Sequence, residues 1–586
     1  MSGAEVTMPE LRQAYKLGQI TPVEVVERLY SRIEMAGCLP VWISLVPFQQ
    51  ALSAARALMN ASPELPLYGV PFAVKDNIDV AGLPTTAGCP EFAYMPERHA
   101  FVVERLIDAG ALVIGKTNLD QFATGLTGTR TPYGVCASTF NAQYISGGSS
   151  SGSAVAVARG DVAFALGTDT AGSGRIPAAF NGLVGMKPTR GLLSTTGVVP
   201  ACRSLDCVSI FARTLDDAER VLEVCAAYDV DDPFSRRSLL SAPSHVRFGC
   251  IAVPSFQQLE FFGDTESAAA FRGVTTRLQE LGWSLESFDF ELLGQAARLL
   301  YQGPWVAERQ VSIGSFVMQH PESVHPIVRK IVEGARQYSA SQAFAASYEL
   351  AGLQRQLQRL WQRVDAIVLP TAPTHFSIEA ALAAPEDSSQ VLGTYTNFAN
   401  LLDLCALAVP AGMKPSGLPF GITWFAPAHQ DRKLFECVRA RHVDGFKSSA
   451  HVSIPDRVTL AVAGAHLDGQ PLNHQLRSRG AQFRAKTATA AEYRLFALNT
   501  NPLKPGLVHA PGNGQSIEVE LWELEVAAFG SFVSEVPAPM TIGNTRLSDG
   551  SVVKGFCCET HALEGARDIT EFLGWRAFLA SLEARA

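Results

Sequence analysis

The sequence lacks several features that would place a protein in a membrane or on a nucleic acid. It has no apolar run as long as a membrane-spanning helix requires. Positive charge is not in excess, because the formal net charge is -8, and this leaves no electrostatic basis for nucleic-acid binding. The first residues, MSGAEVTMPELRQAYKLG, resemble a charged amphipathic helix and not a secretory signal. We therefore expect a cytoplasmic protein with no membrane or nucleic-acid partner.

The sequence also lacks the cysteine and histidine patterns of a disulfide framework or a metal site. Its 11 cysteines are scattered, none forms a C-x-x-C pair, and Cys557 and Cys558 are adjacent. No H-E-x-x-H motif and no Cys/His cluster with metal-ligand spacing occurs. This pattern indicates reduced thiols in a cytosolic protein. We expect neither a metal nor a cofactor.

What the chain does have is enough apolar sequence for a large core. With 586 residues, 47% of them hydrophobic, it is too long for one ordinary domain and too apolar to be disordered. The strand-like runs YGVPFAVKD and GALVIGKT alternate with helical patterns such as SGSAVAVARG, which predicts a layered α/β domain. We place this domain at residues 1–440, a linker at 441–457, and a second, smaller α+β domain at 458–586.

Two matches to familiar motifs are rejected. Residues 110–117, GALVIGKT, fit the phosphate-loop pattern, but the residues between the glycines are apolar and favour a strand. Residues 148–152, GSSSG, fit a nucleophile elbow around Ser150. The preceding FNAQYIS is a poor strand, however, and no later histidine of the first domain lies in a convincing motif. We assign neither a nucleotide site nor a Ser150 nucleophile.

Three other stretches place polar residues where a catalytic group would fit. Lys75 ends the apolar run GVPFAVK, Ser149 lies in the loop ISGGSSSG before an Ala/Val helix, and Ser173 lies in the loop TDTAGSGR. Taken singly, each has an ordinary explanation: a lysine whose charged end reaches the surface, a helix start with hydroxyl caps, and a tight turn. Their order, and the separation of 24 positions from Ser149 to Ser173, make them specific as a set.

As a set, these stretches resemble the signature of the amidase signature family. The resemblance covers roughly residues 10–440 and includes the downstream stretch GLVGMKPTRGLLSTTGVVP. It implies the amidase signature fold, in which helices flank a mixed central sheet. One position departs from the commonest pattern, because Ala171 stands where many members have glycine.

The resemblance also implies roles for single residues. Ser173 would be the nucleophile, Ser149 would pass its proton toward Lys75, and the Gly–Ser peptide before Ser149 would be cis. Lys75 can act as the base only when neutral, and burial lowers a lysine pKa in that direction. An oxyanion hole is implied, formed by the backbone N–H groups of Thr170, Ala171, Gly172 and Ser173.

Within the family, three stretches resemble the allophanate hydrolase branch. They are DQFATGLTGTRTPYG, LLYQGPWVAERQ and, in the second domain, GAHLDGQPLNHQL. The resemblance implies that Tyr301 and Arg309 bind the substrate and that Gly125 lines its pocket. A planar guanidinium suits a carboxylate, and the separation of eight positions lets one helix present both side chains on one face. The ordinary alternative is an amphipathic helix with a surface arginine.

This resemblance implies that the first domain releases ammonia from allophanate, as part of urea or s-triazine nitrogen use. The second domain would then promote decarboxylation of the N-carboxycarbamate product. His474 is our candidate there, with His466 behind it, although a lone histidine is more often structural. The expected assembly is a homodimer, with association to other enzymes of a urea or cyanuric acid pathway.

Other functions stay open at this point. A general amidase with an accessory domain would turn over simple amides but not allophanate. One chain of a glutamine-dependent amidotransferase would need partner chains and would show little activity alone. A catalytically inactive scaffold is disfavoured by the intact set of Lys75, Ser149 and Ser173.

Overall fold

The computed structural model describes residues 7–37, 39–237, 249–440, 457–500 and 502–584. These residues form two compact units, one on either side of residue 450. Of the linker predicted at 441–457, residues 441–456 lie outside the described residues. None of the described helices has the length and apolar character that crossing a membrane requires.

The described residues of the first unit are built on a sheet of 11 strands. The sheet is mixed, as predicted. β2 (Pro71–Lys75) pairs in parallel with β3 (Leu112–Thr117) and β4 (Phe164–Thr168), and β4 pairs antiparallel with β6 (Val208–Ala212). The order across the sheet is β1, β3, β2, β4, β6, β5, β10, β11, β9, β7 and β8. The remaining strands are β1 (Trp42–Leu45), β5 (Val184–Lys187), β7 (Cys250–Pro254), β8 (Ser284–Phe288), β9 (Ala366–Pro370), β10 (Leu404–Met413) and β11 (Pro419–Pro427).

The central strands of this sheet are apolar at nearly every position, and the protein buries them on both faces. All residues of β2, β4 and β6 are buried, which is typical of strands with both faces covered. The predicted helix in SGSAVAVARG is α5 (Ser151–Ala158), which packs against β2, β3, β4 and β6. The predicted strand in GALVIGKT is β3, so the chain is extended where a phosphate loop would have to turn.

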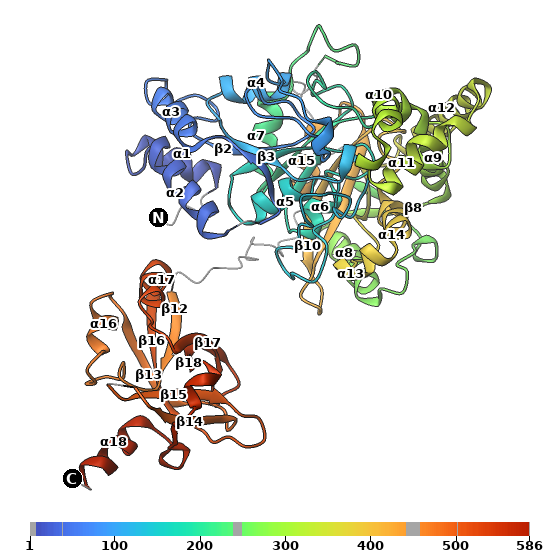
Figure 1. Cartoon of the computed structure of the whole chain (residues 1–586). Coiled ribbons are helices and arrows are strands. Elements are labelled where there is room, and N and C mark those ends of the chain that lie inside the picture. Colours follow the sequence, from blue (N-terminus) through green and yellow to red (C-terminus); the bar gives the residue numbers. More distant parts are fainter. Residues whose placement is uncertain (1–6, 38, 238–248, 441–456, 501, 585–586) are drawn as a thin grey trace. The chain divides into compact units, whose positions relative to one another are not determined.

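The other helices of this unit surround the sheet, and Figure 1 shows α9 to α12 grouped together on one side. They are α1 (Met8–Lys16), α2 (Pro22–Met35), α3 (Phe48–Leu58), α4 (Phe101–Asp108), α6 (Ile176–Phe180), α7 (Leu215–Cys225), α8 (Thr265–Glu280), α9 (Glu291–Tyr301), α10 (Val306–Gln319), α11 (Pro326–Gly334), α12 (Ala340–Leu360), α13 (Ile378–Ala383), α14 (Pro385–Leu392) and α15 (Asp431–Ala440).

The second unit has its own sheets and its own core, in agreement with the predicted smaller α+β domain. A five-stranded sheet has the order β13, β16, β12, β18, β17, and a three-stranded sheet has the order β15, β14, β19. Trp522, Leu460 and Phe578 belong to its apolar core. The elements are β12 (Arg457–Val462), α16 (Asn473–Arg477), β13 (Gln482–Ala488), β14 (Tyr493–Leu498), β15 (Lys504–His509), β16 (Glu518–Glu525), α17 (Val526–Ser534), β17 (Met540–Arg546), β18 (Val552–Cys558), β19 (Arg567–Asp568) and α18 (Trp575–Glu583).

Candidate active site

The predicted base lies where two parallel neighbours of the large sheet end. Lys75 is the last residue of β2 and Thr168 is the last residue of β4, and these strands pair in parallel. Both side chains therefore lie at the same edge of the sheet. Lys75 Nζ is 2.7 Å from Ser149 Oγ and 2.7 Å from Thr168 Oγ1. The structure thus brings Lys75 and Ser149 into contact and adds Thr168, which the sequence analysis missed.

The surroundings of Lys75 favour its neutral form. Its side chain is fully buried, with 0% of its surface exposed. Burial lowers the pKa of Lys75 to about 7, against the opposing effect of the carboxylates of Asp120, Asp169 and Asp206. Near neutral pH, a large fraction of the Lys75 amine is therefore free to accept a proton.

Ser149 lies in the loop that leads into α5, two positions before the helix begins at Ser151. The peptide between Gly148 and Ser149 is cis, as the family resemblance implies. Ser149 is fully buried, and its carbonyl oxygen accepts the backbone N–H of Asp120 at 3.0 Å. The serine is thereby held at its backbone as well as at its hydroxyl, which Lys75 contacts.

The loop that carries Ser173 folds around the carboxylate of Asp169. Asp169 Oδ1 accepts the backbone N–H of Gly172 at 2.8 Å, and Oδ2 accepts that of Gly174 at 3.0 Å. The Arg175 guanidinium binds both oxygens, at 2.8 and 2.9 Å. Burial disfavours the charged carboxylate, but Arg175, Lys187 and the Gly174 N–H together hold the pKa of Asp169 below its usual value. The loop that carries Ser173 is therefore held by a buried ion pair.

The backbone conformation just before Ser173 requires a glycine at position 172. Its φ is +135°, and a Cβ atom there would lie 2.4 Å from Thr396 Oγ1. Ser173 itself is 3% exposed. Within the described residues, no hydrogen bond joins Ser173 Oγ to Ser149 Oγ, and such catalytic contacts commonly tighten only when substrate binds.

The predicted oxyanion donors differ in their availability. The Gly172 N–H is already donated to Asp169, so it is not directed at a substrate oxygen in this structure. In the described part of the chain, the N–H groups of Thr170, Ala171 and Ser173 donate to no protein acceptor, so three of the four predicted donors remain available. The Thr170 hydroxyl donates to Asp206 Oδ1 at 2.5 Å, and burial raises the pKa of Asp206 to about 6.

The two predicted substrate-binding residues are in contact, but they do not share a helix. α9 ends at Tyr301 and α10 begins at Val306, so the single helix expected from their spacing is wrong. Gly303 and Pro304 lie in the break, where proline cannot donate the backbone hydrogen bond of a continuous helix. Arg309 Nη2 donates to the Tyr301 hydroxyl at 3.2 Å.

The Arg309 guanidinium is buried and incompletely paired. Arg309 is 1% exposed, and its Cζ lies 4.8 Å from the centre of the Tyr301 ring. Among the described residues, neither Nε nor Nη1 of Arg309 finds a hydrogen-bond partner. Buried polar groups normally find partners, so Arg309 has donors left over for an acceptor that the protein itself does not supply.

Gly125 lines a large cavity together with Tyr301, Arg130 and Asn397. A Cβ atom on Gly125 would lie 2.6 Å from Asp120 Oδ2, so the absence of a side chain there is required for packing. Gly125 and Tyr301 therefore share a cavity wall, whereas Lys75, Ser149 and Ser173 lie outside its lining.

A cavity of about 170 Å³ lies in the second unit, and only one of the two histidine candidates lines it. His466 lines it, along with Gln475, Lys504 and Glu535, whereas His474 is exposed and outside the lining. His466 Nε2 lies 3.0 Å from Gln475 Oε1, and its ring stacks on Phe556 with centroids 5.0 Å apart. His474 Nδ1 lies 2.9 Å from the carbonyl oxygen of Pro471.

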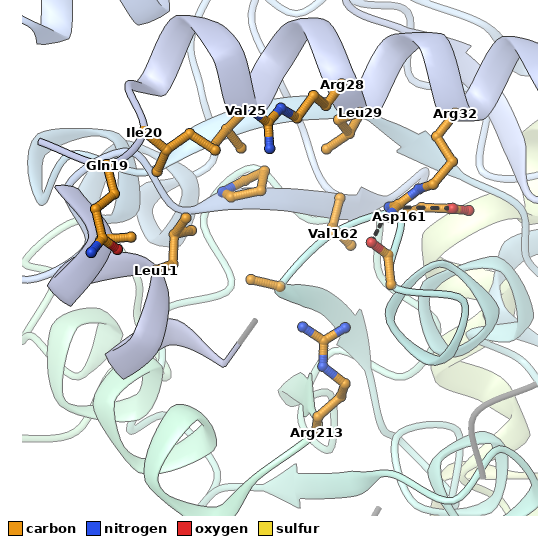
Figure 2. A pocket seen from close by; sticks show the side chains of 14 residues that line it. Leu11, Gln19, Ile20, Val25, Arg28, Leu29, Arg32, Asp161, Val162 and Arg213 are labelled. Carbon is orange, nitrogen blue, oxygen red and sulfur yellow. Dashed lines mark hydrogen bonds and ion pairs between the residues drawn. The ribbon is translucent and has the colours of Figure 1, made fainter. Parts of the chain in front are cut away.

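A further cavity of the first unit lies between α1, α2 and the chain around Asp161 (Figure 2). Arg28 and Arg213 extend toward it from opposite sides, and Arg32 Nη2 lies 3.8 Å from Asp161 Oδ1. Its lining contains none of the predicted site residues. Among the described residues, no group of three or more His, Cys, Asp or Glu side chains is placed to hold a metal ion.

Sequence reasoning missed the residues that support the loops. Thr168 and Asp169 lie in the same polar stretch as Ser173, so a hydroxyl and a carboxylate at the end of β4 were an available signal. Asp206 carries no signal of its own, because it meets Thr170 across 36 residues of chain.

Both units match known protein families. Residues 24–435 match the Amidase family, and residues 458–580 match the Allophanate hydrolase C-terminal domain. The chain is 43% identical over 590 aligned residues to a urea amidolyase of Saccharomyces cerevisiae, covering 95% of this chain and 32% of that protein. It is 30% identical to one of the glutamyl-tRNA(Gln) amidotransferase subunits of Methylacidiphilum infernorum, over 73% of this chain and 92% of that one.

Among solved structures, an allophanate hydrolase of Kluyveromyces lactis is similar over both units. It has a TM-score of 0.73 and 40% identity, covering 99% of this chain and 100% of that one. The chain spans about a third of the urea amidolyases that it matches. On the match over residues 24–435, together with the match over 458–580, the chain belongs to the amidase family and carries an allophanate hydrolase C-terminal domain.

Proposed function

We propose that this chain is an amidohydrolase that hydrolyses allophanate to ammonia and carbon dioxide. The observation that carries the substrate is the buried, incompletely paired Arg309 guanidinium against Tyr301. The carbonyl oxygen of a simple amide can accept a hydrogen bond from this cation but brings no charge to balance it. Allophanate is an amide with a carboxylate at its other end, which supplies that charge. The similarity to proteins named allophanate hydrolase and urea amidolyase supports the same substrate.

In the first step, Ser173 attacks the carbonyl carbon that bears the terminal amino group. The Ser173 proton passes to Ser149, whose own proton passes to the neutral Lys75, 2.7 Å away. The carbonyl π electrons move onto oxygen, and the N–H groups of Thr170, Ala171 and Ser173 stabilise that oxyanion. When the tetrahedral intermediate collapses, the C–N bond breaks and the proton returns from Lys75 through Ser149, so that ammonia leaves.

In the second step, water repeats the attack on the acyl-enzyme. The water proton travels through Ser149 to Lys75. When the intermediate collapses, the C–O bond to Ser173 breaks and the proton returns through Ser149 to the Ser173 oxygen, which restores the hydroxyl. The product is N-carboxycarbamate, whose carboxylate Arg309 would have held throughout. Gly125 and Tyr301 would contact the substrate from the cavity that they line, whereas Arg309 lies outside that lining, against Tyr301.

The second unit would then act on this anion. His466, Lys504 and Glu535 line one cavity, so the cavity offers an imidazole and a cation to a small carboxylate, beside one carboxylate of its own. Burial lowers the pKa of His466, which keeps the imidazole neutral and able to exchange a proton. We infer that His466, in place of the exposed His474, assists loss of carbon dioxide from N-carboxycarbamate.

The proposed function is tested by measuring ammonia released from allophanate by the full chain and by His466→Ala. The full chain should release both substrate nitrogens as ammonia, because decarboxylation frees the second one. The variant should release the first nitrogen at the normal rate and the second slowly. Turnover of other amides with none of allophanate would contradict the substrate and favour a general amidase. His474→Ala is the matched control and should behave as the full chain.

Arg309→Lys tests the proposed carboxylate contact. Lysine keeps the charge but loses the planar fork, so the KM for allophanate should rise by about 10- to 100-fold. Steady-state kinetics on allophanate, and on an uncharged amide that the enzyme also hydrolyses, make the measurement. An equal effect on both substrates, or none on allophanate, would mean that Arg309 does not bind the carboxylate.

We further propose a homodimer in the cytoplasm that works beside the enzymes supplying allophanate from urea or cyanuric acid. The free thiols of the described cysteines support a reducing compartment. Sedimentation of the purified chain tests the dimer.

A further inference from the structure

Asp120 is buried beside the Lys75–Ser149 pair, and the reaction steps above leave it without a role. Its side chain is fully buried, and its two oxygens accept the backbone N–H groups of Gly128 at 3.0 Å and Arg130 at 2.8 Å. Asp76 and Asp169 form ion pairs with lysine or arginine, but Asp120 has no such partner among the described residues. A buried carboxylate without a cation is costly, so its position calls for an explanation.

The backbone and the side chain of Asp120 both contact the segment that carries Ser149. The Asp120 N–H donates to the Ser149 carbonyl oxygen at 3.0 Å. A Cβ atom on Gly148 would lie 2.2 Å from Asp120 Oδ2, and one on Gly125 would lie 2.6 Å from it. The carboxylate thus fills a space that two glycines leave open, directly against the peptide before Ser149.

Three carboxylates face Lys75 from three parts of the sheet edge: Asp120 after β3, Asp169 after β4 and Asp206 before β6. Arg175 already neutralises Asp169, and Asp206 is partly protonated near neutral pH because burial raises its pKa to about 6. Asp120 has the largest of the three effects, raising the pKa of Lys75 against the effect of burial.

The charged and titratable groups near Asp120 itself belong to other segments. The Arg130 side chain turns away to the carbonyl oxygens of Thr124 and Pro385 and to the Ser389 hydroxyl. His325 lies close enough for Asp120 to raise its pKa, although burial lowers that pKa more strongly. Asp120 also contributes to the raised pKa of the buried Cys136 thiol, although burial is the larger cause. Neither Arg130 nor His325 forms an ion pair with Asp120 in the described structure, so no cation there neutralises the carboxylate.

We propose that Asp120 is a positioning residue for the proton relay: it holds the Ser149 segment and presents a fixed negative charge to Lys75. When Ser173 attacks, Lys75 becomes a buried cation, and a carboxylate already in place stabilises that charge as it forms. This inference rests on the proposed roles of Lys75, Ser149 and Ser173.

Asp120→Asn tests the inference, because it keeps the size of the side chain and removes its charge. The acid limb of the pH–rate profile should move to lower pH by about one unit, because Lys75 loses a stabilising charge. The rate at the plateau should fall by about 100-fold. A residue that only packs would lower the rate equally at every pH and leave the limb in place.

Two readouts separate this inference from the substrate assignment. One is ammonia release from allophanate, and the other is phosphonylation of Ser173 by a fluorophosphonate, whose P–F bond breaks as the activated serine oxygen bonds to phosphorus. The second needs no allophanate, and Ser173→Ala shows that the label is at Ser173. If the wild-type chain is labelled but leaves allophanate intact, the substrate proposal fails, and the labelling profile still decides the role of Asp120.

A second variant keeps the test usable if Asp120→Asn does not fold. Asp120→Ser is smaller, leaves room for water at the two N–H groups, and should shift the limb in the same direction. Asp161→Asn removes another buried carboxylate, one with no proposed role in the reaction. Its pH profile should match that of the wild type in both assays. An unshifted acid limb in either Asp120 variant that still melts cooperatively would overturn the inference.

Discussion

Ser173→Ala is expected to lower kcat for allophanate by about 10⁴-fold or more. The neighbouring Thr168 and Thr170 hydroxyls are engaged by Lys75 and Asp206, so without Ser173 we expect only the oxyanion donors and binding contacts to remain. The effect should fall on kcat and leave KM nearly unchanged, because the proposed substrate contacts of Arg309 and Tyr301 are kept. Steady-state ammonia release at saturating allophanate measures it, with thermal unfolding as the check on folding.

Ser150→Ala is the matched control for this prediction. Ser150 is the central serine of the rejected GSSSG motif, and its hydroxyl donates to the Thr168 carbonyl oxygen at 3.2 Å. Its replacement should change kcat by less than about tenfold, the order expected for one neutral hydrogen bond. A normal rate in Ser173→Ala, together with a lost rate in Ser150→Ala, would transfer the nucleophile to Ser150.

The wild-type rate is expected to fall on the acid side of about pH 7. Burial lowers the pKa of Lys75 to about 7, so the amine is protonated below that pH and cannot accept the proton from Ser149. Well below pH 7, kcat/KM should fall about tenfold for each pH unit, since the neutral fraction falls by that factor. Lys75→Ala should remove this limb and lower kcat by about 10³-fold or more.

The measurement is a profile of kcat/KM across the acid and neutral range. Lys16→Ala is the control, because Lys16 is an exposed lysine of α1 that pairs with Glu64 on the surface. Its profile should match the wild type. A wild-type rate that stays constant through pH 7, or an unchanged acid limb in Lys75→Ala, would mean that another group titrates in catalysis.

Local sequence was enough for elements whose pattern is strong over a few residues. The apolar run before Lys75 is β2, the run rejected as a phosphate loop is β3, and the Ala/Val stretch after Ser149 is α5. Each forms where it does because apolar, β-branched or small residues are continuous along it. The spacing between Tyr301 and Arg309 misled, since a helical period alone does not reveal the break at Gly303 and Pro304.

By itself, the sequence determined the family, the two-part organisation of the chain and the polar stretches that carry Lys75, Ser149 and Ser173. These features depend only on which residues are present and in what order, and both can be read from the sequence. Only the tertiary structure decided which groups meet. It placed the Thr170 hydroxyl on Asp206 and Thr396 against Gly172, and it directed the Gly172 N–H to Asp169. Such contacts depend on strand register and on how separate loops pack. The distances between these groups, and the burial that changes their pKa values, are therefore set only when the sheet forms.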